Sequence, residues 1–231
     1  MSTTTITAVI FVIIILSIAA IYISQSRERA RIAKVQRINA GKERYQRMQQ
    51  LLHELPPQYL NNDLRIMIAE RSIETLKELL ALDKSPQYES NLKTDLEYVK
   101  QLKEKNPKIA PVKVNSEAKA KEVRNNLEVL QRFIQTQHKN KRIPASNAKK
   151  YLDYIALSIC QSKADIFDAR ANAATGKPRV AIHNYHCAID AFKPLASSPP
   201  ALKIIQKYKA KIKQLEAEAD QANQTSAPKT P

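Results

Sequence analysis

An apolar run close to the start of the chain is the feature that most limits what this sequence can fold into. Residues 6–23 read ITAVIFVIIILSIAAIYI, and fifteen of these eighteen residues are apolar. Eighteen helical residues rise about 27 Å, which is close to the hydrocarbon thickness of a bilayer. No charged side chain occurs before Arg27. The run therefore predicts a single transmembrane helix.

The charges around this run favour an uncleaved signal-anchor over a cleaved signal peptide. A signal peptide carries Lys or Arg before its apolar segment, whereas here the basic residues follow it. The positive-inside rule then predicts an inner-membrane, single-pass protein with its N-terminus outside and its C-terminal domain in the cytoplasm. The basic residues either bind anionic lipid headgroups or only set this topology. These predicted membrane-surface residues are Arg27, Arg29, Arg31, Lys34, Arg37, Lys42, Arg44 and Arg47.

Composition indicates that the rest of the chain is helical. The 231 residues include only two glycines and no tryptophan, and no segment shows the alternating pattern of a strand. Two lone cysteines make no disulfide framework, and a cytoplasmic location predicts that both stay reduced. We therefore expect an all-α fold, in which the transmembrane helix precedes a cytoplasmic domain of helical hairpins.

Prolines, capping residues and changes in composition divide the chain into segments. Pro56-Pro57 predicts the end of one helix, Ser116 the N-cap of another, and Gly176 the end of a third. Ile38, Tyr45 and Leu52 recur every seven residues, so the segment before Pro56 either forms a short coiled coil or docks on the domain. The expected segments are an anchor (1–25), a basic juxtamembrane helix (26–55), a first helical hairpin (56–105), a linker (106–115), a helical domain (116–224) and a disordered tail (225–231).

The stretch GKPRVAIHNYHCAIDAFKPL, residues 176–195, resembles the second half of a tetratricopeptide repeat. The residues that carry the resemblance are Gly176, Ala181, Tyr185, Ala188 and Pro194. The small residues let one helix approach another closely, the aromatic ring fills the groove between them, and the glycine permits a tight turn. The resemblance implies a fold of paired helices with a groove for a protein or peptide. The whole layout also resembles single-pass bacterial membrane proteins with a helical cytoplasmic domain, which implies no activity.

The same stretch contains the best candidates for chemistry, His183, His186 and Cys187. They gather on the face of the predicted helix opposite Ala181 and Tyr185. A zinc site needs further ligands that converge on one point, and a Cys–His nucleophile needs an orienting partner and an oxyanion hole. The sequence shows none of these. We therefore read this face as a solvated or helix-packing surface.

No other motif indicates an enzyme. With only two glycines, neither a P-loop nor a dinucleotide-binding loop is present. Asp165 and Asp168 are more simply read as charges on a helix surface. We predict no catalytic, metal-binding or cofactor-binding residues, and no cofactor.

Two functions remain. The first is a membrane-anchored, non-enzymatic scaffold or adaptor that binds an unidentified protein or peptide through its helical domain. The alternative, suggested by the net charge of +16, is a membrane-tethered protein that binds nucleic acid through its basic surface. Against this alternative, the sequence lacks the pattern of aromatic residues interleaved with basic ones, in which the aromatic rings stack on bases. The sequence does not indicate whether the chain forms homo-oligomers.

Overall fold

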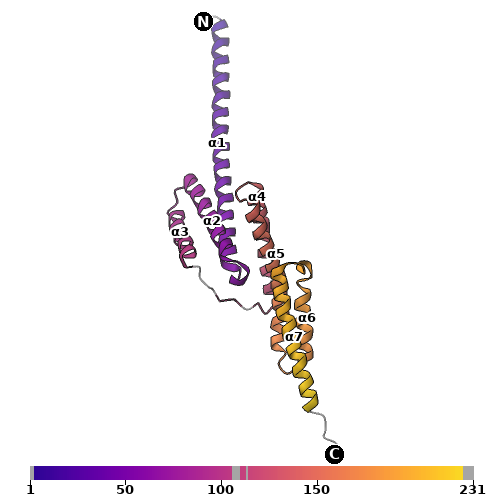
Figure 1. Cartoon of the computed structure of the whole chain (residues 1–231). Helices are drawn as coiled ribbons and strands as arrows, with labels where there is room; N and C mark the ends of the chain where they lie inside the picture. Colours follow the sequence, from indigo (N-terminus) through magenta and orange to yellow (C-terminus); the bar gives the residue numbers. More distant parts are fainter. Residues whose placement is uncertain (1–2, 106–109, 113, 226–231) are drawn as a thin grey trace, which may run out of the picture. The chain divides into compact units, whose positions relative to one another are not determined.

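A computed structural model describes the backbone of residues 3–105, 110–112 and 114–225, and the side chains of residues 21–104, 110–112 and 114–220. This part of the chain forms seven α-helices and two short 3-10 helices, and it contains no strand (Figure 1). The predicted all-α class is therefore confirmed. In chain order the elements are α1 (Thr3–Glu54), η1 (Pro57–Tyr59), α2 (Asn62–Leu82), α3 (Pro86–Lys105), α4 (Glu117–Lys139), α5 (Ala145–Ala173), α6 (Pro178–Asp190), η2 (Lys193–Leu195) and α7 (Pro199–Thr225).

The structure contradicts the prediction of a transmembrane helix. Among the described residues, no helix is both long enough and apolar enough to cross a bilayer. The described side chains of α1 begin at Ile21, and from Arg27 onward charged residues recur every few positions, so no apolar stretch of sufficient length remains. The side chains of residues 1–20, which include most of the apolar run, lie outside the described residues. The location in a cell membrane stays a prediction that the fold does not test.

The described chain separates into two compact units. The first unit contains residues 1–49 and 67–104, and the second contains residues 50–66 and 105–231. Residues 50–66 thus group with the C-terminal helices, although the sequence placed residues 56–66 in the first hairpin. Of the predicted linker, residues 106–109 and 113 lie outside the described residues, as do residues 226–231 of the predicted tail.

In the first unit, α1, α2 and α3 form an antiparallel set. Side-chain bonds join Arg44 of α1 to Glu78 of α2, and Lys103 of α3 to Glu70 of α2. Leu76, Leu79 and Tyr88 form an apolar cluster to which Ile38 and Tyr45 of α1 contribute. This packing favours docking over a coiled coil for that part of α1.

Gly41 permits the close approach of α1 to α2. A Cβ atom placed on Gly41 would lie 2.7 Å from Cδ2 of Leu79, a side chain that is itself fully buried. The sequence alone assigns no role to this glycine. Its role is in fact to remove a side chain at the contact between two helices.

A buried polar network joins the three helices of the first unit. The Asp95 carboxylate on α3 accepts a hydrogen bond from Ser72 Oγ of α2 at 2.8 Å and another from Gln49 Nε2 of α1 at 2.9 Å. Ser72 and Asp95 are both buried. Nearby, burial and then the negative charge of Asp95 raise the pKa of Tyr45 to about 12.

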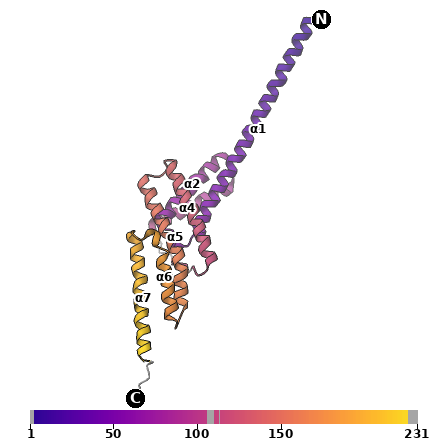
Figure 2. The ribbon, with the colours of Figure 1, turned by 90° about the vertical axis from the view of Figure 1, so that its right-hand side faces the viewer.

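In the second unit, α5, α6 and α7 pack side by side (Figures 1 and 2). Their apolar cluster is centred on Phe192, which is fully buried. On another side α5 packs against α4, whose buried stripe is Val123, Leu127, Leu130 and Ile134. The stripe has the four- and three-residue spacing of one helix face, as the sequence indicated.

The helix ends follow the predicted capping residues in most cases. The Ser116 hydroxyl accepts a hydrogen bond from the backbone N–H of Lys119 at 3.3 Å and so caps α4. Gly176 has φ of +72° in the turn between α5 and α6, a conformation that favours glycine. Helix α6 ends at Asp190, and Pro194 lies in the separate 3-10 helix η2 that follows.

Candidate binding groove of the second unit

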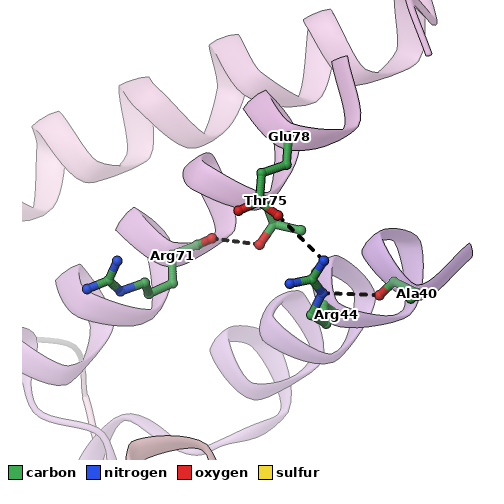
Figure 3. Close-up of polar contacts among 5 residues, drawn as sticks. All are labelled: Ala40, Arg44, Arg71, Thr75 and Glu78. Carbon is green, nitrogen blue, oxygen red and sulfur yellow. Dashed lines mark hydrogen bonds and ion pairs between the residues drawn. The ribbon is translucent and has the colours of Figure 1, made fainter. Parts of the chain in front are cut away.

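The eight basic residues predicted at a membrane surface all belong to α1 in the first unit, and all are exposed. Two of them make contacts within the unit. The Lys42 ammonium lies 5.9 Å from the centre of the Tyr88 ring. Figure 3 shows the Arg44 guanidinium, which donates to the carbonyl of Ala40 and to the Glu78 carboxylate of α2. Figure 3 also shows the Thr75 hydroxyl, which donates to the Arg71 carbonyl within α2. The exposed ion pair between Arg44 and Glu78 contributes little to stability.

The residues that resemble a tetratricopeptide repeat lie at the contact between α6 and its neighbours. Ala181, Tyr185 and Ala188 are buried in the apolar cluster of the second unit, and the Tyr185 ring lies 5.8 Å from that of Tyr208 on α7. Pro194 is exposed in η2. Three of the five residues therefore have a packing role, while the repeat family itself stays a prediction.

His183, His186 and Cys187 lie on the outer side of α6. Cys187 Sγ is 3.7 Å from Nε2 of His183, and both histidines are exposed. Among the described residues, no three His, Cys, Asp or Glu side chains converge as a metal site requires. Cys187 is half-buried, and it lines a groove between α4, α5 and α6.

This groove is a concave surface formed by described residues of the second unit. It is open on one side, has a volume of about 650 Å³, and lies where α4, α5 and α6 meet. Clefts that bind ligands have volumes of roughly 300–1,000 Å³. The groove is lined by Glu117, Ala118, Lys121 and Arg124 of α4, Lys163, Ile166 and Phe167 of α5, and Cys187, Asp190 and Ala191 at the end of α6.

The floor of the groove is apolar because α5 carries large side chains on the face between its two neighbours. Ile166 is buried and Phe167 is half-buried, and they meet the half-buried Cys187 and Ala191 from α6. Ala118 on α4 is small and exposed, so it keeps the groove open on that side. The arrangement can hold an apolar side chain of a partner, and it presents no cluster of groups for catalysis.

The charged residues around the groove fall into two kinds. The two acidic residues have partners, since Glu117 bonds to Arg170 at 2.7 Å and Asp190 to Lys193 at 3.0 Å. The basic residues Lys121, Arg124 and Lys163 have no ion-pair partner among the described residues. Positive charge at the groove is therefore left without compensation from the second unit.

Asp165 and Asp168 lie on the side of α5 opposite the groove. Each helical residue turns by about 100°, so Asp165 lies about 200° around the helix from the groove residue Lys163. Asp168 is three residues further, a turn of about 300°, and therefore lies on the same side as Asp165. Asp165 accepts a hydrogen bond from the hydroxyl of the buried Tyr59 at 2.5 Å. Burial raises the pKa of Asp165, and it also raises the pKa of Tyr59 and of Tyr208. Asp168 accepts from Lys211 of α7 at 2.8 Å. These carboxylates join elements of the second unit, so the interpretation of both as simple surface charge was wrong.

The resemblance implied a groove, but sequence reasoning did not identify the residues that line this one, because they come from three helices. One indication was present in the sequence of α4. Ala118, Lys121 and Arg124 are spaced three residues apart and therefore share one face of this helix, beside its apolar stripe. Nothing in the sequence places Lys163 or Cys187 against that face. Only the packing of α4 and α6 on α5 brings them together.

Comparisons with protein-family models, with curated proteins and with solved structures find no match to this chain.

Proposed function

We propose that the protein is a non-enzymatic adaptor that binds a protein partner in the groove between α4, α5 and α6. The observation that carries the proposal is the groove itself, which combines an apolar floor with a polar rim. Surfaces of this composition are typical of sites that receive a peptide segment or a helix of a partner. The fold alone does not define a function, so the proposal depends on this site.

The helices that form the groove are suited to a rigid binding surface. The apolar side of α5 packs on α6 and α7 around the fully buried Phe192, and α4 is fixed to α5 along its buried stripe. Because the groove is formed by helices and not by loops, its shape is set before a partner arrives. Such preorganisation lowers the entropic cost of binding.

Photo-crosslinking in the native cell tests this proposal. A photoreactive amino acid replaces Ala118, which is exposed on the rim of the groove. A matched variant has the same amino acid at Lys209, which is exposed on α7 and does not line the groove. We expect a discrete crosslinked protein with the Ala118 variant, absent with the Lys209 variant, whose crosslinked peptide is then identified by mass spectrometry.

Treatment with nuclease distinguishes the alternative function. If the product at Ala118 survives nuclease and is absent at Lys209, the adaptor function is supported. A product that both positions give equally would contradict the groove as the site. A product that nuclease removes would show that the chain binds nucleic acid instead.

A further inference from the structure

We infer that the groove between α4, α5 and α6 selects an acidic peptide segment that carries apolar side chains. This inference rests on the proposed function and specifies the chemistry of the partner. It depends on three features of the groove: its unpaired basic residues, its neutralised acidic residues and its apolar floor.

The basic residues provide charge complementarity. Lys121 and Arg124 lie three positions apart on one face of α4, and Lys163 projects from α5 into the same groove. None of the three has an ion-pair partner among the residues that the structure describes, and Arg124 is half-buried. A half-buried guanidinium without a carboxylate gains most from a partner that supplies one.

The acidic residues of the rim do not cancel this positive charge. Glu117 is held by Arg170, and Asp190 is held by Lys193. Each of these pairs is neutral as a unit, so the groove as a whole keeps the charge of its three unpaired cations. A basic segment would meet repulsion there, whereas Asp or Glu side chains would be attracted and oriented.

The apolar floor specifies the second property of the partner. Ile166 and Phe167 of α5 lie between the cations of α4 and the half-buried Cys187 of α6. A purely polar anion would leave this surface in contact with water. An apolar side chain placed between acidic ones would cover the floor and reach the cations at the same time.

Nucleic acid fits the groove less well than such a peptide. Single strands are held by exposed aromatic rings on which bases stack, together with a basic track along the backbone. Phe167 is the only aromatic residue among those that line the groove, and it is half-buried in the floor. The remaining floor is aliphatic or small.

Selection from a library of short random peptides tests the inference without knowledge of the partner. The full-length chain is compared with two triple variants of equal charge. The groove variant is Lys121→Glu, Arg124→Glu and Lys163→Glu. The control variant is Lys203→Glu, Lys209→Glu and Lys213→Glu, which changes exposed residues of α7 that do not line the groove. Circular dichroism establishes that both variants keep the helical content of the parent.

For the parent and the control variant, we expect enrichment of peptides that combine Asp or Glu with apolar residues. The groove variant should bind the selected peptides at least about tenfold more weakly than the parent, because three charge-assisted contacts are reversed. A competing short duplex DNA should not displace the peptides from the parent at physiological salt.

Three results would overturn the inference. They are the absence of acidic enrichment, equal weakening by the control variant, and displacement of the peptides by the DNA. A discrete, nuclease-resistant crosslink at Ala118 combined with enrichment of neutral or basic peptides would retain the adaptor function and reject only the acidic partner. Loss of both the crosslink and the enrichment would reject the adaptor function as well.

Discussion

The polar network of the first unit and the groove of the second unit use polar residues in opposite ways. In the first unit, polar side chains from α1, α2 and α3 meet in the interior, where Asp95 accepts bonds from Ser72 and Gln49. In the second unit, the cluster around Phe192 is apolar, and unpaired cations gather at the rim of a groove. The first arrangement satisfies its polar groups internally, whereas the second leaves charge and apolar surface for a partner.

This difference distinguishes the buried polar network of the first unit from the open groove of the second. A buried network that is complete fixes the relative register of helices and leaves none of its own groups for a partner. A groove with an apolar floor and unpaired cations gains free energy only when another molecule covers it. Substitutions in the network and in the groove test this contrast.

The largest expected effect is a loss of stability, which should be greater for a substitution in the core of the second unit than for one in the floor of its groove. Phe192→Ala should destabilise the second unit by about 3–5 kcal/mol, because the side chain is fully buried and leaves a cavity. Phe167→Ala should cost roughly 1–2 kcal/mol, since this ring is half-buried at the groove. Hydrogen exchange with mass spectrometry, which resolves the two units, measures both changes. Equal costs would mean that the groove floor is part of a closed core.

Removal of the central carboxylate tests the closed network of the first unit. Asp95→Ala should destabilise that unit by about 3 kcal/mol, because Ser72 and Gln49 lose a charged partner in the interior. Lys100→Ala on the same helix is the control, since Lys100 is exposed, and should change stability by less than about 0.5 kcal/mol. Denaturant unfolding followed by circular dichroism gives both values. A loss as small as that of the control would show that the network does not hold the helices.

The substitution Gly41→Ala tests how closely α1 packs against α2 in the first unit. In an exposed helix, Gly→Ala is stabilising by about 1 kcal/mol. Here the added methyl group would lie 2.7 Å from Leu79 Cδ2, and overpacking costs about 1–3 kcal/mol, so Gly41→Ala should be net destabilising by roughly 1 kcal/mol. In the Leu79→Ala background the same change should become stabilising. Stabilisation of the otherwise unchanged chain would contradict the close contact.

The smallest effect concerns the half-buried Asp165 of the second unit. Burial raises its pKa in the folded state, so the protonated carboxyl is favoured by folding and its ionisation opposes folding. This contribution to stability is present at pH below the ordinary value for Asp and is lost as the pH rises through the raised pKa. Relative to Asp165→Asn, the parent should therefore lose stability across that range.

Thermal or denaturant unfolding at a series of pH values measures this difference. Asp153→Asn, at an exposed position of the same helix, is the control for removal of a carboxyl group. If the stability of the parent relative to Asp165→Asn rises with pH instead, hydrogen bonding by Tyr59 dominates over burial.

Local signals in the sequence predicted much of the fold. The paired prolines ended α1, Ser116 capped α4, and the left-handed Gly176 separated α5 from α6. Each of these depends on the backbone preference of one or two residues, which acts over a single turn. The apolar spacing of α4 likewise matched its buried face.

The misses have a common cause, which is pairing between residues distant in the chain. Asp165 looks like a helix-surface charge until Tyr59 is placed against it, and Gly41 looks neutral until Leu79 is. The lining of the groove could not be predicted, because it forms only when three helices pack together. The transmembrane prediction was made from a local apolar run, and it was overturned among the described residues, where α1 is interrupted by charge.

The most direct test of the central claim uses the two cysteines. Cys187 lines the groove, whereas Cys160 is buried and burial raises the pKa of its thiol, so it reacts slowly and serves as an internal reference. Alkylation of both residues in the full-length chain is followed by mass spectrometry, with and without a saturating acidic peptide from the selection. We predict that the peptide slows modification of Cys187 and leaves Cys160 unchanged. Unaltered modification of Cys187 at saturation would show that the peptide binds elsewhere and would contradict the groove as the binding site.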